Sequence, residues 1–252
     1  MVNNFRIYKN FNLSKKDKGA IILIGNFDGL HKGHQKLFNK AKSFKKKFKL
    51  RIGVITFDPI PKMFFKQLNN YRLSNFNQKI QLLKKNYVDF IVNQKFDTRF
   101  SKISCHDFIK KFLFNKIKPK YIFVSDNFRF GYKRAGDIKL LKSLEKDFDF
   151  KIINPSPLKS KRFIISSTLI RKNLETGNLK KVKKFLGRNW CIEGKVEKGR
   201  QLGKKIGFPT CNINIKNYKI PKIGVYAVKV SFKNKRKLKG IANIGYRPTF
   251  NQ

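Results

Sequence analysis

Short apolar runs alternate with longer mixed segments between residues 20 and 154, and this alternation restricts the fold more than any other feature of the sequence. The runs, such as "AIILIG", "GVITF" and "YIFV", are four to six residues long and are bounded by Gly, Asp or Pro, as is typical of buried parallel strands. The segments between them, such as "HQKLFNKAKSFKKKF", repeat apolar residues at helical spacing. Strands that alternate with helices predict an open, doubly wound α/β sheet of the Rossmann-like kind.

The pattern changes after the segment "ISSTLIRKNLETGNLKKVKKFLGR", in which we expect two short helices. From Trp190 onward, alternating or β-branched runs such as "FPTCNINI" and "GVYAVKVSF" are separated by Gly and Pro turns. This spacing predicts a small all-β barrel or sandwich. We therefore divide the chain into an α/β domain over residues 1–187 and an all-β domain over residues 188–252.

The chain is strongly basic, with 60 Lys and Arg against 14 Asp and Glu, which gives a net charge of +46. Such a charge attracts phosphates, nucleic acid or anionic membranes, and a nucleic-acid-binding protein is one interpretation. The other is a compositional bias, because Lys, Asn, Ile and Phe are abundant along the whole chain and the lysines are not collected in one tail. We favour the bias, so nucleic acid is not the expected partner.

Cysteines and apolar segments indicate the compartment. The three cysteines have no CxxC spacing, so the sequence predicts neither a disulfide framework nor a zinc site. Because no apolar run approaches the roughly 18–20 residues of a spanning helix, we expect a soluble cytoplasmic protein without a membrane partner. The sequence predicts no particular oligomeric state.

The stretch "IILIGNFDGLHKGHQKLF" places a strand, a glycine-rich turn and the start of a helix in succession. Ligands of α/β sheets bind at the carboxyl ends of strands, where helix N-termini offer free N–H groups to phosphate. Glycines let the backbone approach a ligand closely, and imidazoles can donate hydrogen bonds to phosphate oxygens. The turn and helix start contain Gly25, Asn26, Asp28, Gly29, His31, Gly33 and His34. Spacing alone also fits a glycine-rich turn with solvated histidines.

Two further segments admit a phosphate-binding role. In "SSTLIRKNLETG", one of three hydroxyl residues is expected to cap a helix that ends at Gly177, and the same hydroxyl groups and N–H groups suit phosphate. In "KGRQLGKKIGFPTCNINI", regularly spaced glycines among cations suggest a phosphate-holding loop before a strand. Thr210 and Asn212 would lie on one side of that strand and carry neutral oxygens that suit Mg²⁺, or would simply be solvated.

A family resemblance favours the functional interpretation. The segments "GNFDGLHKGH", "TFDPIP", "VSDNFRFGYKRAGD", "ISSTLIR", "GFPTCNI", "GVYAV" and "GIANIGYRPTF" occur in this order. Each resembles a segment of the bacterial bifunctional riboflavin kinase/FMN adenylyltransferases, also called FAD synthetases. The resemblance extends over essentially the whole chain. It implies that ATP, FMN and riboflavin are substrates and that Mg²⁺ is the cofactor.

For the first domain, the resemblance implies transfer of AMP from ATP to FMN, with His31 and His34 as catalytic residues. The residues implied for the nucleotide site are Gly25, Asn26, Phe27, Asp28, Gly33, Ser166, Ser167, Thr168 and Arg171. Those implied for the flavin or nucleotide pocket are Asp126, Asn127, Phe128 and Arg129. One departure is Ile60, which stands where the family commonly has a histidine between two prolines.

For the second domain, the resemblance implies phosphorylation of riboflavin by ATP, with Thr210 and Asn212 at the metal. The residues implied for the ATP loop are Gly199, Gly203, Lys204 and Gly207. Lys204 replaces the usual arginine, which keeps the charge but loses the bidentate donor geometry. The sequence stops at Gln252. By the resemblance, the closing strands of the barrel and the glutamate that acts as the base on the riboflavin hydroxyl would follow, so we expect a fragment or an impaired kinase half.

Two alternatives remain at this point. A basic nucleic-acid-binding protein is supported only by the net charge. A related nucleotidylyltransferase with another acceptor is compatible with the paired histidines, but "GFPTCNI" and "GIANIGYRPTF" argue against it. An enzyme of FAD biosynthesis with small-molecule substrates is the favoured expectation.

Overall fold

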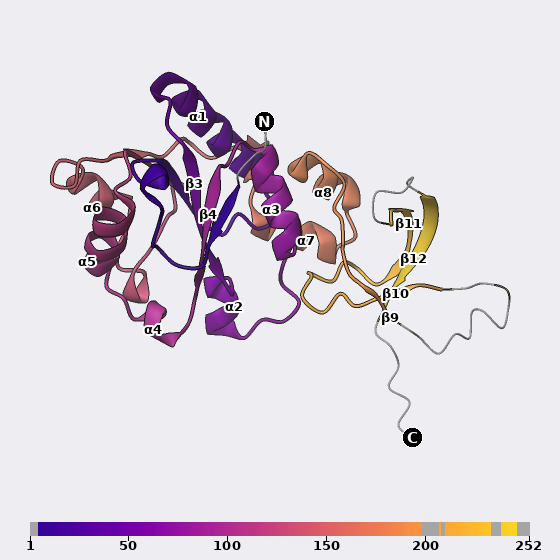
Figure 1. Cartoon of the computed structure of the whole chain (residues 1–252). Helices are drawn as coiled ribbons and strands as arrows, with labels where there is room; N and C mark the ends of the chain where they lie inside the picture. Colours follow the sequence, from indigo (N-terminus) through magenta and orange to yellow (C-terminus); the bar gives the residue numbers. More distant parts are fainter. Residues whose placement is uncertain (1–4, 198–206, 208–209, 233–237, 246–252) are drawn as a thin grey trace.

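The computed structural model describes residues 5–197, 207, 210–232 and 238–245 (Figure 1). Its centre is a six-stranded sheet in the order β1-β4-β3-β2-β5-β6, and every neighbouring pair is parallel. The strands are β1 (Arg6–Tyr8), β2 (Ile21–Ile24), β3 (Ile52–Asp58), β4 (Phe90–Lys95), β5 (Tyr121–Phe123) and β6 (Lys151–Ile153). The predicted doubly wound α/β sheet is confirmed, with β1 as an addition at the edge that the sequence patterns did not indicate.

Helices cover both faces of this sheet. Successive side chains of a strand point to opposite faces, so neighbouring residues of β2 contact different helices. Ile21 and Leu23 of β2 pack with residues of α1 (Lys32–Phe48) and α3 (Phe76–Lys85). Ile22 and Ile24 pack on the other face with residues of the π-helix η2 (Phe108–Ile117) and of α6 (Ile138–Ser143). These two clusters bury the interior strands on both sides, which explains why their sequences read as continuous apolar runs.

The strand order reverses at β2. The chain leaves β2 through α1 to reach β3 on one side, whereas β5 pairs with β2 on the other side. In open α/β sheets, ligands bind outside the carboxyl ends of the strands at such a reversal. The turn that follows β2 therefore occupies the position where the fold favours a ligand site.

The remaining elements of the α/β part are short. They are η1 (Lys15–Asp17), α2 (Pro61–Lys66), α4 (Thr98–Ser101), α5 (Cys105–Asp107), η3 (Tyr132–Arg134), the hairpin of β7 (Lys159–Ser160) and β8 (Phe163–Ile164), α7 (Ser167–Glu175) and α8 (Leu179–Leu186). The last two helices were predicted, and they pack with Leu73 and Ile165 in a third apolar cluster. Across the described residues, no helix is long and apolar enough to cross a bilayer.

The part after α8 contains antiparallel strands, as its sequence pattern predicted. The described strands form two pairs, β9 (Val196–Glu197) with β10 (Asn212–Ile213) and β11 (Gly224–Val230) with β12 (Leu238–Ile244). Burial alternates along β11 and β12, and Val225 and Ile241 are largely exposed.

Residues of this β-rich part pair directly with the α/β part. Tyr218 forms a parallel bridge with Arg72, whose N–H donates to the carbonyl of Asn217 at 3.1 Å and whose carbonyl accepts from Lys219 at 2.7 Å. The Trp190 indole donates to the carbonyl of Leu73 at 2.9 Å. We call residues 71–75 the joint segment, since the same stretch also contacts the turn after β2.

Candidate active site

The turn between β2 and α1 has a demanding backbone. Phe27 and Leu30 have φ values of 46° and 38°, and Gly29 between them has a φ of 74°. These values lie in the left-handed region, which only glycine enters without steric cost. A Cβ at Gly29 would also lie 2.9 Å from the Cβ of Leu73 in the joint segment. The sequence "NFDGLH" is therefore held in a tight conformation against that segment.

The two histidines meet where α1 begins. His31 is the N-cap residue, and its Nδ1 accepts a hydrogen bond from the backbone N–H of His34 at 3.3 Å. The two rings stack with centroids 3.6 Å apart and an interplanar angle of 20°. A Cβ at Gly33 would lie 2.9 Å from the carbonyl oxygen of Ile165, so glycine permits the approach of the segment before α7. Because Nδ1 of His31 accepts, its proton resides on Nε2 in the neutral ring.

Both imidazoles are neutral near pH 7. Burial of the ring, and after it the positive charges of Arg171 and Arg188, lowers the pKa of His31 to about 4. Burial, and after it His31 and Lys79, holds the pKa of His34 well below its ordinary value. Neutral rings act on an anion as hydrogen-bond donors, and an anion placed beside them would raise both pKa values.

Asp28 is buried below the histidines, with 2% of its surface exposed. Its carboxylate accepts from the N–H groups of Leu73 at 3.0 Å and Ser74 at 3.1 Å, and from Nη2 of Arg171 at 2.5 Å. Arg171 also donates from Nε to the carbonyl of Tyr71 at 2.7 Å. The polar atoms of Asp28 and Arg171 are thus directed at each other and at the joint segment, so the pair fixes the turn to that segment.

The start of α7 lies against the same turn. Ser166 is the N-cap residue, and its Oγ accepts from the N–H of Leu169 at 3.2 Å. Ser167 donates from Oγ to the carbonyl of Asp28 at 2.9 Å, and Thr168 is exposed. The predicted cap is confirmed at Ser166, and the helix ends just before Gly177, which has a φ of 72°. The hydroxyl residues of this segment are therefore brought beside the histidine turn.

The segment after β5 lies at the carboxyl end of the strand next to β2. Asp126, Asn127 and Arg129 are exposed, and Arg129 pairs with Asp137 at 2.6 Å. Phe128 is half-buried and stacks on Phe130 at 5.4 Å between ring centroids. Phe130 itself belongs to the core of the sheet.

Several residues of the site had no signal in the sequence. Arg188, after α8, donates from Nη2 to the carbonyl of Gly29 at 2.6 Å and so supports the turn. Arg72 pairs with Asp58, at the end of β3, at 2.5 Å. Ile60, at the departure from the family, is buried and precedes α2. A lone arginine after a helix gives no pattern from which such contacts could be inferred.

The residues expected at the second site are only partly described. Gly199, Gly203 and Lys204 lie outside the described residues. Gly207 is exposed with a φ of 81°, and Thr210 and Asn212 are exposed. Asn212 lies in β10 opposite Glu197, whereas Thr210 precedes that strand.

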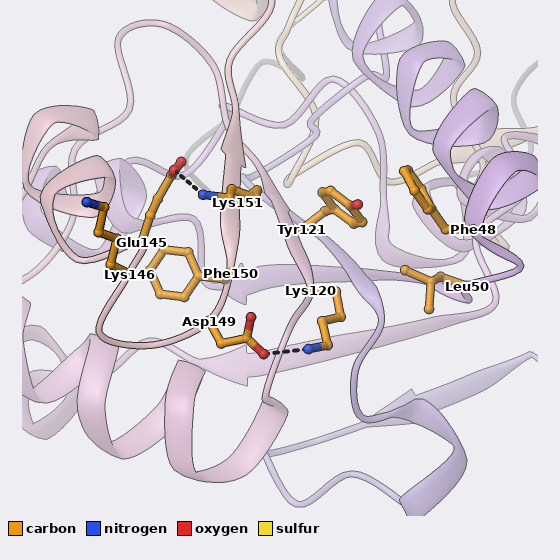
Figure 2. A pocket seen from close by; sticks show the side chains of 9 residues that line it. All are labelled: Phe48, Leu50, Lys120, Tyr121, Glu145, Lys146, Asp149, Phe150 and Lys151. Carbon is orange, nitrogen blue, oxygen red and sulfur yellow. Dashed lines mark hydrogen bonds and ion pairs between the residues drawn. The ribbon is translucent and has the colours of Figure 1, made fainter.

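A shallow pocket lies at the amino ends of β5 and β6, at the opposite end of the strands from the histidine turn (Figure 2). Phe48, Leu50 and Tyr121 line one side of it. Its two carboxylates, of Asp149 and Glu145, are paired with Lys120 at 2.5 Å and Lys151 at 3.3 Å. None of the residues expected in either site lines it. Among the described residues, no three His, Cys, Asp or Glu side chains form a group that could hold a metal ion.

Comparison with known proteins gives consistent matches over both parts of the chain. Residues 13–169 match the family described as FAD synthetase, and residues 186–252 match the family described as riboflavin kinase. Two relatives are named bifunctional riboflavin kinase/FMN adenylyltransferase. The one from Buchnera aphidicola subsp. Schizaphis graminum is 40% identical over 95% of this chain and 77% of its own length. The one from Escherichia coli K12 is 36% identical over 94% of this chain and 77% of its own length.

A solved structure also resembles the whole chain. It is described as a macrolide-efflux protein from Streptococcus pneumoniae, has a TM-score of 0.82 and is 28% identical. The match covers 98% of this chain and 81% of the other. The arrangement of the sheet and of the β-rich part is thus shared with a crystal structure.

Proposed function

Since this chain belongs to the family of bifunctional riboflavin kinase/FMN adenylyltransferases, we propose that it makes FAD by transferring AMP from ATP to FMN. Residues 1–187 would carry this reaction, and residues 188–252 would carry the phosphorylation of riboflavin to FMN. The observation that supports the first activity most is the neutral histidine pair at the strand-order reversal, where the fold favours a phosphate ligand. ATP, FMN and riboflavin are the small-molecule partners, and the cytoplasm is the compartment that holds them.

The reaction asks mainly for positioning and for stabilisation of charge. An oxygen of the FMN phosphate attacks the α-phosphorus of ATP, the bond from that phosphorus to the α,β-bridging oxygen breaks, and pyrophosphate leaves. His31 and His34 would donate hydrogen bonds to the oxygens on which charge develops. The glycine-rich turn, with Gly25, Asn26 and Gly33, would let the backbone approach the phosphates. Phe27 lies buried behind His34, with ring centroids 5.1 Å apart, and would support that ring.

The α7 start and the segment after β5 would complete the site. Ser166, Ser167 and Thr168 would present N–H groups and hydroxyls to the triphosphate, and the buried Asp28–Arg171 pair would hold the turn in place. The segment over 126–129 would form one wall of the flavin or nucleotide pocket, with the half-buried ring of Phe128 available for an aromatic ring of the substrate.

Mg²⁺ would reach the protein together with ATP. Neutral oxygens of one or two residues fit this ion when phosphate oxygens and water complete its shell, and Thr210 and Asn212 offer such oxygens in the second domain. These two residues would hold the ion where it would neutralise phosphate charge. Gly199, Gly203, Lys204 and Gly207 would form the loop that holds the ATP phosphates of the kinase reaction.

Product analysis tests both activities. The purified protein is incubated with Mg-ATP and either FMN or riboflavin, and the flavins are separated by chromatography. FAD formed from FMN would support the first activity, and FMN formed from riboflavin would support the second. The absence of both products, together with salt-dependent binding to DNA or RNA, would favour the nucleic-acid-binding alternative.

A further inference from the structure

Lys79 of α3 is a buried cation beneath the histidine turn, and the proposed function gives it no role. Only 1% of its surface is exposed. Its Nζ donates to Oγ1 of Thr56 at 3.2 Å, and that hydroxyl, fully buried on β3, donates to the carbonyl of Asn26 at 3.3 Å. Two consecutive hydrogen bonds therefore connect the ammonium group to the backbone of the turn that leads to His31.

The charges around Lys79 do not cancel. Asp28 and Asp58 face it, but each already has an arginine partner, Arg171 and Arg72 respectively. Among the described residues, no carboxylate lies within ion-pair distance of Lys79 itself. Asp28 with Arg171 and Asp58 with Arg72 each form a neutral pair, so the charge of Lys79 is left without a counter-ion of its own.

The ammonium group of Lys79 is buried, and burial of a charge costs folding free energy. Burial, countered by Asp28 and Asp58 and reinforced by Arg72, lowers the pKa of Lys79 from 10.5 to about 8. A buried ion without a close counter-ion disfavours folding, and an apolar side chain of similar length avoids that cost. Strongly perturbed groups of this kind cluster at functional sites.

We propose that Lys79 is a positioning residue for adenylyl transfer, which holds the Asn26 turn through Thr56 and keeps one uncancelled positive charge beneath the phosphate site. The proposal rests on the proposed function of the first domain. Lys79 touches no reacting atom. Its charge also favours the neutral form of His34 before substrate binds.

Three variants test the proposal by FAD formation and thermal unfolding. Lys79→Met should lower kcat by about 10- to 100-fold, with KM for ATP and FMN changed by about 3-fold or less, because positioning is lost while the binding groups remain. The same variant should unfold at an equal or higher temperature, whereas removal of a purely structural residue lowers it. Lys85→Met, at the exposed end of α3, is the matched control and should match the wild type in both measurements.

The pH dependence separates the charge from the shape of the side chain. In the wild type, kcat should fall as pH rises through about 8, where Lys79 loses its proton. Lys79→Arg stays charged, so its rate should not fall in that range, and Lys79→Met should be slow at every pH. The folded protein holds fewer protons than the unfolded chain between about 8 and 10.5. The stability advantage of Lys79→Met should therefore shrink as pH rises through that window.

The outcomes are distinct. Wild-type kcat and an unchanged pH profile in Lys79→Met would overturn the proposal. If Lys79→Met unfolds at a lower temperature than the wild type, Lys79→Arg becomes the deciding variant. A fall of kcat above about pH 8 that persists in Lys79→Arg would also overturn the proposal. Failure of the wild type to make FAD would instead contradict the proposed function.

Discussion

The amino ends and the carboxyl ends of the strands in the central sheet each carry an ion pair, and the two pairs differ in burial. We call these two sides of the sheet the amino edge and the carboxyl edge. At the amino edge, shown in Figure 2, Lys120 and Asp149 form an ion pair with 52% and 85% of their side-chain surfaces exposed. At the carboxyl edge, Asp28 and Arg171 form a pair with 2% and 9% exposed, which also binds backbone N–H groups of the joint segment. Exposed pairs contribute little to stability, whereas a buried pair becomes costly when one partner is removed. In this very basic protein, the burial of an ion pair therefore distinguishes the candidate site from an ordinary charged surface.

The largest effect should follow Asp28→Asn, which leaves the buried Arg171 without its counter-charge. We expect the free energy of unfolding to fall by about 3–5 kcal/mol, measured by urea denaturation. The asparagine oxygen can still accept from the N–H of Leu73, but its amide group is a donor facing Nη2 of Arg171, so the loss combines the missing charge with a lost hydrogen bond. A loss no greater than that of an exposed ion pair would remove the distinction between the two edges.

His31→Ala should affect catalysis more than folding. Loss of a donor at the reacting phosphate is expected to lower the rate of FAD formation by about 100-fold or more. His106→Ala is the matched control, because His106 is exposed on the short helix α5, away from the turn. Equal rates for the wild type and the His31 variant would exclude this histidine from the mechanism.

Tyr218→Phe probes the contact between the β-rich part and the α/β part. The hydroxyl of Tyr218 donates to Oε1 of Gln78 at 2.8 Å and accepts from the N–H of Glu193 at 3.0 Å. Its loss should lower the free energy of unfolding by about 1 kcal/mol, because the N–H of Glu193 loses its acceptor whereas Oε1 of Gln78 still accepts from the N–H of Asn75. A second, earlier transition in thermal unfolding would show that the hydroxyl couples the two parts, and an unchanged curve would show that it does not.

Asp149→Asn should have the smallest effect. It breaks the exposed pair with Lys120 at the amino edge, so neither the unfolding midpoint nor FAD formation should change measurably. A marked loss of FAD formation would mean that the Figure 2 pocket takes part in the reaction.

Long periodic segments explain how much of the fold could be predicted. The apolar runs of β2, β3 and β4 are buried on both faces, and α1 and α3 carry clear apolar stripes. Strand β1 was missed because it has three residues, none of them buried, and the hairpin of β7 and β8 is shorter still. Strands this short are stabilised by hydrogen bonds to a neighbouring strand, and that pairing cannot be predicted from the local sequence.

The site was predictable where a local pattern marked it. The paired histidines, the glycines of the turn and the serine cap of α7 stand in recognisable positions. Lys79, Arg72 and Arg188 could not be found in the same way, because each is a single cation among 60 in the chain. Only folding distinguishes them, by burying one beside Thr56 and directing the other two at Asp58 and at the carbonyl of Gly29.

The joint segment has a consequence for exchanging parts between related proteins. Its backbone at Arg72 is paired with Asn217 and Lys219, while its N–H groups at Leu73 and Ser74 hold Asp28. A chimera that keeps residues 1–187 and takes the rest from a relative must therefore offer an extended strand at the place of 217–219. Several separate hydrogen bonds hold the two parts together along this border, and an exchange of one part has to preserve each of them.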